Sequence, residues 1–227
     1  MPESAQMVTP AQRKWLPWLT AVGFFMQTLD GTILNTALPN MAETLGESPL
    51  QMQSVVIAYM LTVALLIPAS GWLADRFGTR RIYLAAILLF TLGSLACAAA
   101  NTLPMLVAAR VLQGVGGALL MPIGRLAVLR VYSKHELLRV MSLVTIPGLV
   151  GPLIGPALGG WLVEVASWHW VFLINLPVGI LGFIASWYFM PDLRQGTATF
   201  DWQGFVMFSA GMVLVSVGLQ GLGEHSI

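Results

Sequence analysis

Long apolar runs alternate along this chain with short polar connections. Each run is about the 20 residues that a helix needs to cross a bilayer. The runs cover residues 15–38, 51–73, 82–100, 104–124, 140–163, 170–190 and 203–222. Because only helices and closed barrels satisfy the backbone in lipid, the pattern predicts an all-α fold, a polytopic transmembrane helical bundle. The short connections predict that consecutive spans are antiparallel neighbours.

Composition and charge agree with a membrane protein. Charged residues make up 9% of the chain and hydrophobic residues 57%, whereas soluble domains carry about 25% charged residues. A net charge of +1 with no basic stripe argues against a nucleic-acid partner. The single cysteine, Cys97, excludes an intrachain disulfide and a cysteine metal cluster, and we expect neither a metal nor a cofactor.

Lysine and arginine residues predict the orientation of the spans. If the N-terminus is cytoplasmic, every basic residue except Arg110 falls on the cytoplasmic side, as the positive-inside rule requires. The connection at residues 71–81 carries Arg76, Arg80 and Arg81, and we expect Gly71 and Gly78 to let it reverse direction in few residues. Its remaining charge, Asp75, either caps a helix N-terminus from elsewhere in the protein or belongs to an ordinary topogenic loop.

These spans suggest a division of the chain. Residues 1–14 form a predicted cytoplasmic tail, 15–190 a six-span unit, 191–202 a cytoplasmic linker and 203–227 a truncated seventh span. An odd number of spans with so short a remainder suggests a fragment.

One acid and one arginine lie inside predicted spans. Asp30 is costly there unless it is paired, solvated or protonated, so it is either a proton or cation site or half of a structural ion pair. Arg110 has a similar predicted depth, and we expect the two side chains to face each other. Gln113, one turn from Arg110, either extends this polar site or makes an ordinary interhelical hydrogen bond.

The fifth span is rich in glycine and proline. Gly151, Gly155 and Gly159 recur every four residues, with Gly160 beside them, and predict a smooth stripe for close helix packing. Pro152 and Pro156 remove backbone hydrogen bonds and predict a bend. The bend is either a gating element or a consequence of generic packing. The chain has no phosphate-binding loop and no serine–histidine–acid arrangement, which disfavours an enzyme.

Several motifs together resemble the major facilitator superfamily, specifically its 14-span drug:proton antiporter branch. The stretches that carry the resemblance are Gly71-x-Leu73-Ala74-Asp75-Arg76-x-Gly78-x-Arg80-Arg81, Leu29-Asp30-Gly31-Thr32 with Asn35 and Pro39, Arg110-x-x-Gln113-Gly114-x-Gly116-Gly117, Gly151-x-x-x-Gly155-Pro156-x-x-Gly159-Gly160 and Trp168-His169-Trp170-x-Phe172-x-x-Asn175. Thr79 departs from the pattern, because the superfamily often has a charged or polar residue there.

The resemblance implies proton-driven export of hydrophobic or cationic small molecules across the bacterial inner membrane. It implies proton coupling by Asp30, Arg110 and Gln113, a cytoplasmic gate around Asp75 and its arginines, and a conformational seal at the fifth-span glycines. A nutrient importer would lack that glycine motif.

The family has two six-span halves with two extra spans between them, and this chain matches the first half plus one further span. Transport would then require the C-terminal half. The alternative is a truncated half that transports nothing and acts as a binding or assembly partner.

Overall fold

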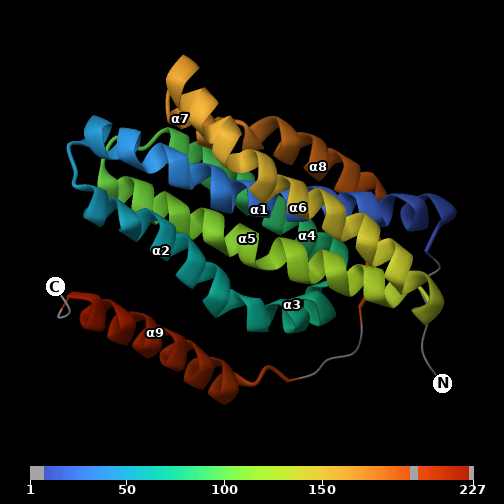
Figure 1. Cartoon of the computed structure of the whole chain (residues 1–227). Helices are drawn as coiled ribbons and strands as arrows, with labels where there is room; N and C mark the ends of the chain where they lie inside the picture. The colour runs from blue at the N-terminus through green and yellow to red at the C-terminus, as the bar shows by residue number, and fades with distance from the viewer. Residues whose placement is uncertain (1–7, 195–198, 225–227) are drawn as a thin grey trace.

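The computed structural model describes residues 8–194 and 199–224, with side chains up to residue 215. The described residues form helices and no strand (Figure 1). The elements are α1 (Pro10–Leu45), α2 (Pro49–Leu66), η1 (Ile67–Ala69), α3 (Ser70–Phe77), α4 (Thr79–Ala98), α5 (Leu103–Val131), α6 (Lys134–Val165), α7 (His169–Leu173), α8 (Asn175–Phe189) and α9 (Trp202–Glu224). The all-α prediction is confirmed. Residues 1–7 of the predicted tail and 225–227 of the predicted seventh span lie outside the described residues.

Local capping signals make the helices longer than the predicted spans. Thr9 begins α1 with a capping box to Gln12, and Ser133 begins α6 in the same way. Such boxes satisfy amide groups that have no partner within the helix. The apolar runs leave residues 125–139 outside the predicted spans, but only Tyr132 and Ser133 separate α5 from α6.

The connection predicted at residues 71–81 is also mostly helical. Gly71 lies inside α3, and its conformation is not the reason that the chain turns. The turn is made at Gly78 alone, where φ is +92°. A Cβ atom on Gly78 would also clash with Oδ1 of Asp192, so glycine is required here both for the backbone angle and for the close approach of the segment after α8.

Five helical segments of the described residues are long and apolar enough to cross a membrane: Pro49–Phe77, Thr79–Ala98, Leu103–Val131, Lys134–Val165 and His169–Phe189. The chain is therefore a multi-pass membrane protein. The other two predicted spans are helical as well, but α1 carries Gln27, Asp30 and Asn35 along its length and is not in this group. In α9, the apolar part with described side chains is Trp202–Val215.

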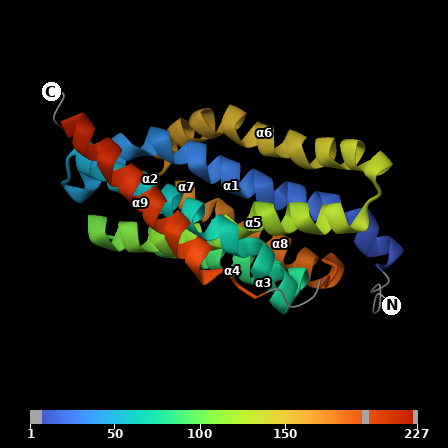
Figure 2. The same ribbon diagram turned by 90° about the horizontal axis from the view of Figure 1, so that it is seen from below.

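Helix neighbours do not follow the order of the chain. The most extensive contacts of α1 are with α6, and those of α2 are with α5. Within the described part of the chain, only α4 and α5 are both consecutive and closely packed. The prediction that consecutive spans are neighbours is therefore wrong for most pairs. Figure 2 shows α6 running beside α1 along one side of the bundle, while α9 lies against α2.

The apolar core is divided into two clusters, one towards each end of the bundle. The helix α1 supplies Met26 to one cluster and Ile33 to the other, and α4 supplies Phe90 and Cys97 in the same way. Between these levels α1, α4 and α5 place polar side chains. The candidate site is built at this level.

Candidate functional site

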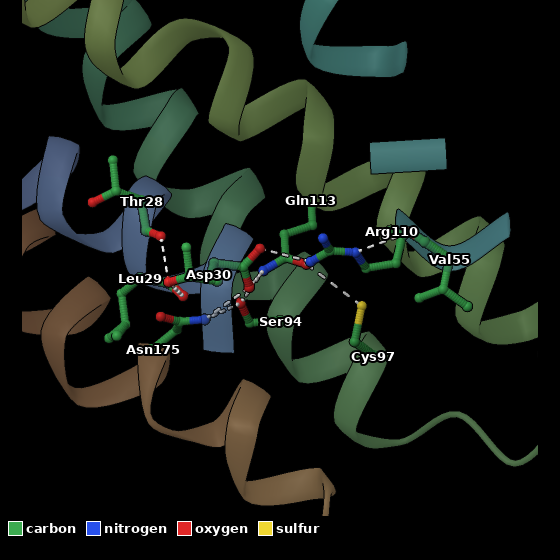
Figure 3. Close-up of polar contacts among 10 residues, drawn as sticks. Thr28, Leu29, Asp30, Val55, Ser94, Cys97, Arg110, Gln113 and Asn175 are labelled. Carbon is green, nitrogen blue, oxygen red and sulfur yellow. Dashed lines mark hydrogen bonds and ion pairs between the residues drawn. The ribbon is translucent and has the colours of Figure 1, made fainter. Parts of the chain in front are cut away.

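Asp30 and Arg110 form a buried ion pair between α1 and α5. Nη1 of Arg110 lies 2.7 Å from Oδ2 of Asp30, and each side chain is only 1% exposed. Figure 3 shows the two side chains pointing towards each other from opposite sides of the site. The prediction that they face each other is confirmed. Burial makes the pair costly to break, since an unpaired charge would remain in an apolar environment.

Gln113 closes the ion pair into a ring of hydrogen bonds. Its Nε2 donates to Oδ1 of Asp30 at 2.7 Å, and its Oε1 accepts from Nη1 of Arg110 at 2.7 Å. The amide thus contacts both charges, and its own two polar ends are satisfied. Gln113 extends the polar site, as one of the two sequence interpretations held.

Two further polar residues belong to the site and were not predicted from the sequence. Asn175, the first residue of α8, donates from Nδ2 to Oδ1 of Asp30 and to Oγ of Ser94, at 3.3 Å each. Ser94 of α4 also accepts from Nε2 of Gln113 at 2.8 Å. For Ser94 the only available signal was a polar residue inside an apolar run, which is shared by many residues with no such role. Asn175 belongs to one of the motifs that carry the family resemblance, but no role was predicted for it. The site therefore joins α1, α4, α5 and α8.

All hydrogen bonds to the Asp30 side chain are donated to it. Arg110, Gln113 and Asn175 are donors, an arrangement that suits the ionised carboxylate. Adding a proton to Asp30 would remove the charge that balances Arg110 and one acceptor position. Protonation of Asp30 would therefore leave Arg110 without its balancing charge. No group of three His, Cys, Asp or Glu side chains among the described residues could hold a metal ion.

The residues expected to form a gate lie at the end of the bundle where α3 meets α4. The carboxylate of Asp75 forms an ion pair with Arg130, which lies near the end of α5. It does not cap a helix N-terminus among the described residues. Arg80 donates to the backbone oxygen of Trp187 at the end of α8. Arg76 is exposed, with its guanidinium carbon 5.6 Å from the centre of the Trp72 ring, and Arg81 is exposed. Asp75 thus connects α3 with α5, and Arg80 connects α4 with α8.

Thr79, the position that departs from the motif, is fully buried and holds the segment that follows α8. Its Oγ1 donates to the backbone oxygen of Pro191 at 2.7 Å and accepts from the amide of Leu193 at 2.9 Å. A long charged side chain could not make both bonds in this space.

The fifth-span glycines face α1. A Cβ atom on Gly151, Gly155 or Gly159 would lie within 2.5 Å of the hydroxyl oxygen of a threonine on α1, so the predicted close approach is confirmed for these three. Gly160 is exposed and contacts nothing there. Pro152 and Pro156 point away from α1, and α6 is one uninterrupted helix through both prolines.

Pro152 leaves a backbone oxygen for α1 to bind. Proline has no N–H, so the oxygen of Gly148, four residues earlier, loses its helical partner. Oγ1 of Thr28 lies 2.8 Å from this oxygen and donates to it, since it is nearer than the backbone oxygens of Phe24 and Phe25 in α1, at 3.0 and 3.1 Å. A cross-helix hydrogen bond of this kind is typically worth about 0.5–1.5 kcal/mol.

We expect Thr28→Val to lower the free energy of unfolding by about 1 kcal/mol, because the Gly148 oxygen then has no donor. In a Pro152→Ala background the restored N–H binds that oxygen, and the same change should cost less than half as much. Thermal unfolding of the purified chain in detergent measures both. Thr36→Val is the control, since Thr36 donates within α1 only; an equal cost of Thr28→Val in both backgrounds would contradict the assignment.

The fold and the site together define a multi-pass helical membrane domain built around a buried acid–arginine pair. Comparison with known proteins identifies the family. A model of the Major Facilitator Superfamily matches residues 20–205, and the chain belongs to this superfamily of transporters.

Curated relatives and a solved structure agree with this assignment. Proteins called MdtD, each described as a candidate multidrug resistance protein, are 56% identical in Pectobacterium atrosepticum, over 95% of this chain and 46% of the relative, and 57% identical in Klebsiella pneumoniae, over 93% and 45%. The chain thus spans less than half the length of these relatives. A crystal structure of the peptide transporter POT in complex with alafosfalin matches with a TM-score of 0.68 at 18% identity, over 96% of this chain and 48% of that one, which supports the fold.

Proposed function

We propose that this chain is the N-terminal half of a proton-coupled exporter of hydrophobic or cationic small molecules in the bacterial inner membrane. The observation that carries the proposal is the ion pair of Asp30 and Arg110, buried at the level between the two apolar clusters. An ionisable acid inside a membrane domain is a functional site by default. The description of the relatives as multidrug resistance proteins supports the substrate class.

In this mechanism Asp30 takes up a proton before one change of conformation and releases it before the reverse change. The carboxylate is held by Arg110, Gln113 and Asn175. Protonation from the outer side removes its charge and weakens the pair between Asp30 and Arg110, which favours a different packing of α1 against α5. Release of the proton to the cytoplasm restores the pair. Substrate leaves in the opposite direction.

The basic residues support a cytoplasmic N-terminus. Figure 1 draws the start of α1, the α3–α4 turn, the α5–α6 junction and the end of α8 at one end of the bundle. The arginines of these segments then share the cytoplasmic side. At that side the ion pair of Asp75 with Arg130 and the contact of Arg80 with α8 form the proposed gate.

Transport by this mechanism requires a second half. Alternating access moves two halves around a central site, and the relatives are about twice as long as this chain. The chain by itself would then bind a complementary half without transporting. Binding of a complementary half without transport is the second candidate function. It is favoured for the isolated chain because the chain covers only 46% and 45% of the two relatives.

The test uses the chain joined to the C-terminal half of the Klebsiella relative, in inverted membrane vesicles. We expect addition of a lipophilic cation to release protons from the acidified lumen. Asp30→Asn should lower the rate of this release by at least about 10-fold, as expected for the loss of an essential proton carrier. Glu47→Gln, an acid in the connection before α2, is the control. Unchanged drug-dependent proton flux in Asp30→Asn would refute the coupling role. Flux from the unjoined chain would refute the requirement for a second half.

A further inference from the structure

A tyrosine on α2 contacts the arginine of the ion pair. The guanidinium carbon of Arg110 lies 4.1 Å from the centre of the Tyr59 ring. The ring is 5% exposed, so this contact is almost free of water. Attraction between a cation and an aromatic face is strongest in such desolvated places.

The same turn of α2 offers a second contact to Arg110. Nε of Arg110 donates to the backbone oxygen of Val55, one turn before Tyr59, at 3.4 Å. To the guanidinium, α1 thus supplies the charge of Asp30, α2 supplies an aromatic face and a carbonyl dipole, and α7 supplies the more distant ring of Phe172, whose centre lies 5.9 Å from the guanidinium carbon. Only the first of these depends on the protonation state of Asp30.

Glycines of the fourth-span motif make room for Tyr59. A Cβ atom on Gly117 would lie 2.6 Å from the Tyr59 hydroxyl oxygen, and one on Gly114 would lie 3.2 Å from the Tyr59 backbone oxygen. Larger residues at these positions would push α2 away from α5. Arg110, Gly114 and Gly117 thus lie along the side of α5 that α2 contacts, and the ring sits directly against the helix that carries the arginine.

The Tyr59 hydroxyl is buried and has no hydrogen-bond partner among the described residues. The hydroxyl therefore does not fix the side chain in place, and what holds Tyr59 at the site is its ring. By contrast, Tyr83, another fully buried tyrosine, donates to the backbone oxygen of Leu19 and makes no such contact with Arg110.

We infer that Tyr59 is a positioning residue for Arg110: its ring face, with the Val55 oxygen, keeps the guanidinium in the site while Asp30 carries a proton. A buried arginine without its carboxylate partner would otherwise be expelled or would draw water into the core. The inference rests on the proposed function for one point, that Asp30 is protonated during the transport cycle. The contact between Tyr59 and Arg110 does not depend on transport. Asp30 would then control whether Arg110 has a charged partner, and Tyr59 would control whether the guanidinium remains in the site.

The single cysteine provides the readout for the chain as it is, purified in detergent. Cys97 is buried, and its thiol donates to Oε1 of Gln113, the atom that also accepts from Arg110. Opening of the site around Arg110 should therefore expose Cys97 to a small maleimide. Asp30→Asn stands in for the protonated acid, because the amide has the same shape and no charge.

In the Asp30→Asn background we expect Tyr59→Leu to raise the rate of Cys97 alkylation by about 10-fold or more, as for the loss of a desolvated cation–aromatic contact. Tyr59→Phe keeps the ring and should change the rate by less than about 2-fold. Tyr83→Leu is the matched control for a lost buried ring. Equal rates in Tyr59→Leu and Tyr83→Leu would overturn the inference.

Two further measurements exclude a purely structural role. With Arg110→Leu added, the difference in the rate of Cys97 alkylation between Tyr59→Leu and Tyr59→Phe should vanish, and its persistence would overturn the inference.

If Tyr59→Leu does not fold, phenylalanine analogues with increasing fluorine content at position 59 keep the shape but weaken the ring's negative face. Alkylation should then rise stepwise with fluorine content, and a flat series would overturn the inference. Proton flux that survives Asp30→Asn would refute the proposed function while leaving this result intact.

Discussion

Replacing Arg110 by leucine is expected to lower the free energy of unfolding by about 3–5 kcal/mol, the usual cost of removing one partner of a buried ion pair. Asp30 would lose the cation that balances it in a site that is 1% exposed, with only the amides of Gln113 and Asn175 left as donors. Gln113 would also lose the donor to its Oε1. Unfolding of the purified chain in detergent, followed by circular dichroism, measures this change.

The matched controls separate the lost pair from a lost side chain. The double variant Asp30→Asn with Arg110→Leu should recover more than half of the stability, because no uncompensated charge then remains. Arg139→Leu removes an exposed arginine on α6 and should cost less than about 0.5 kcal/mol. A double variant as unstable as Arg110→Leu alone would mean that the charge of Asp30 is not what the arginine balances.

Replacing Gly159 by leucine should destabilise the contact between α1 and α6 by about 1–3 kcal/mol or more, as overpacking of a close interface does. A Cβ atom there would clash with Oγ1 of Thr36 and lie 2.6 Å from the backbone oxygen of Ile33. The threonine can rotate, but the backbone oxygen cannot move without shifting α1. Thermal unfolding of the chain in detergent measures the effect.

The adjacent glycine provides the control. Gly160 is exposed, and a Cβ atom added to it would have no neighbour within 4 Å among the described residues, so Gly160→Leu should be neutral or slightly stabilising. Both substitutions gain the same helix propensity, about 0.8–1 kcal/mol for replacing glycine. The difference between the two therefore isolates the packing against α1. Equal stabilities would contradict the close approach of α1 and α6.

The sequence predicted the features that depend on local composition. Apolar runs of bilayer length predicted the helices, because lipid leaves the backbone few alternatives. The isolated charges of Asp30 and Arg110 predicted a buried pair, since neither is tolerated alone in a span. Helix boundaries were predicted less well. Capping boxes at Thr9 and Ser133 extend α1 and α6 beyond their apolar parts, and hydropathy does not register such extensions.

What the sequence by itself determined, then, is that this chain forms a helical membrane bundle with one acid–arginine pair inside it. Only the tertiary structure decided which helices are neighbours, because every lipid-compatible helix offers a similar apolar surface and short connections do not fix the partner. The pairing of α1 with α6 follows from glycines opposite threonines. Asn175, Ser94 and Tyr59 join the site because separate helices bring them to one level, and their spacing along the chain carries no sign of it.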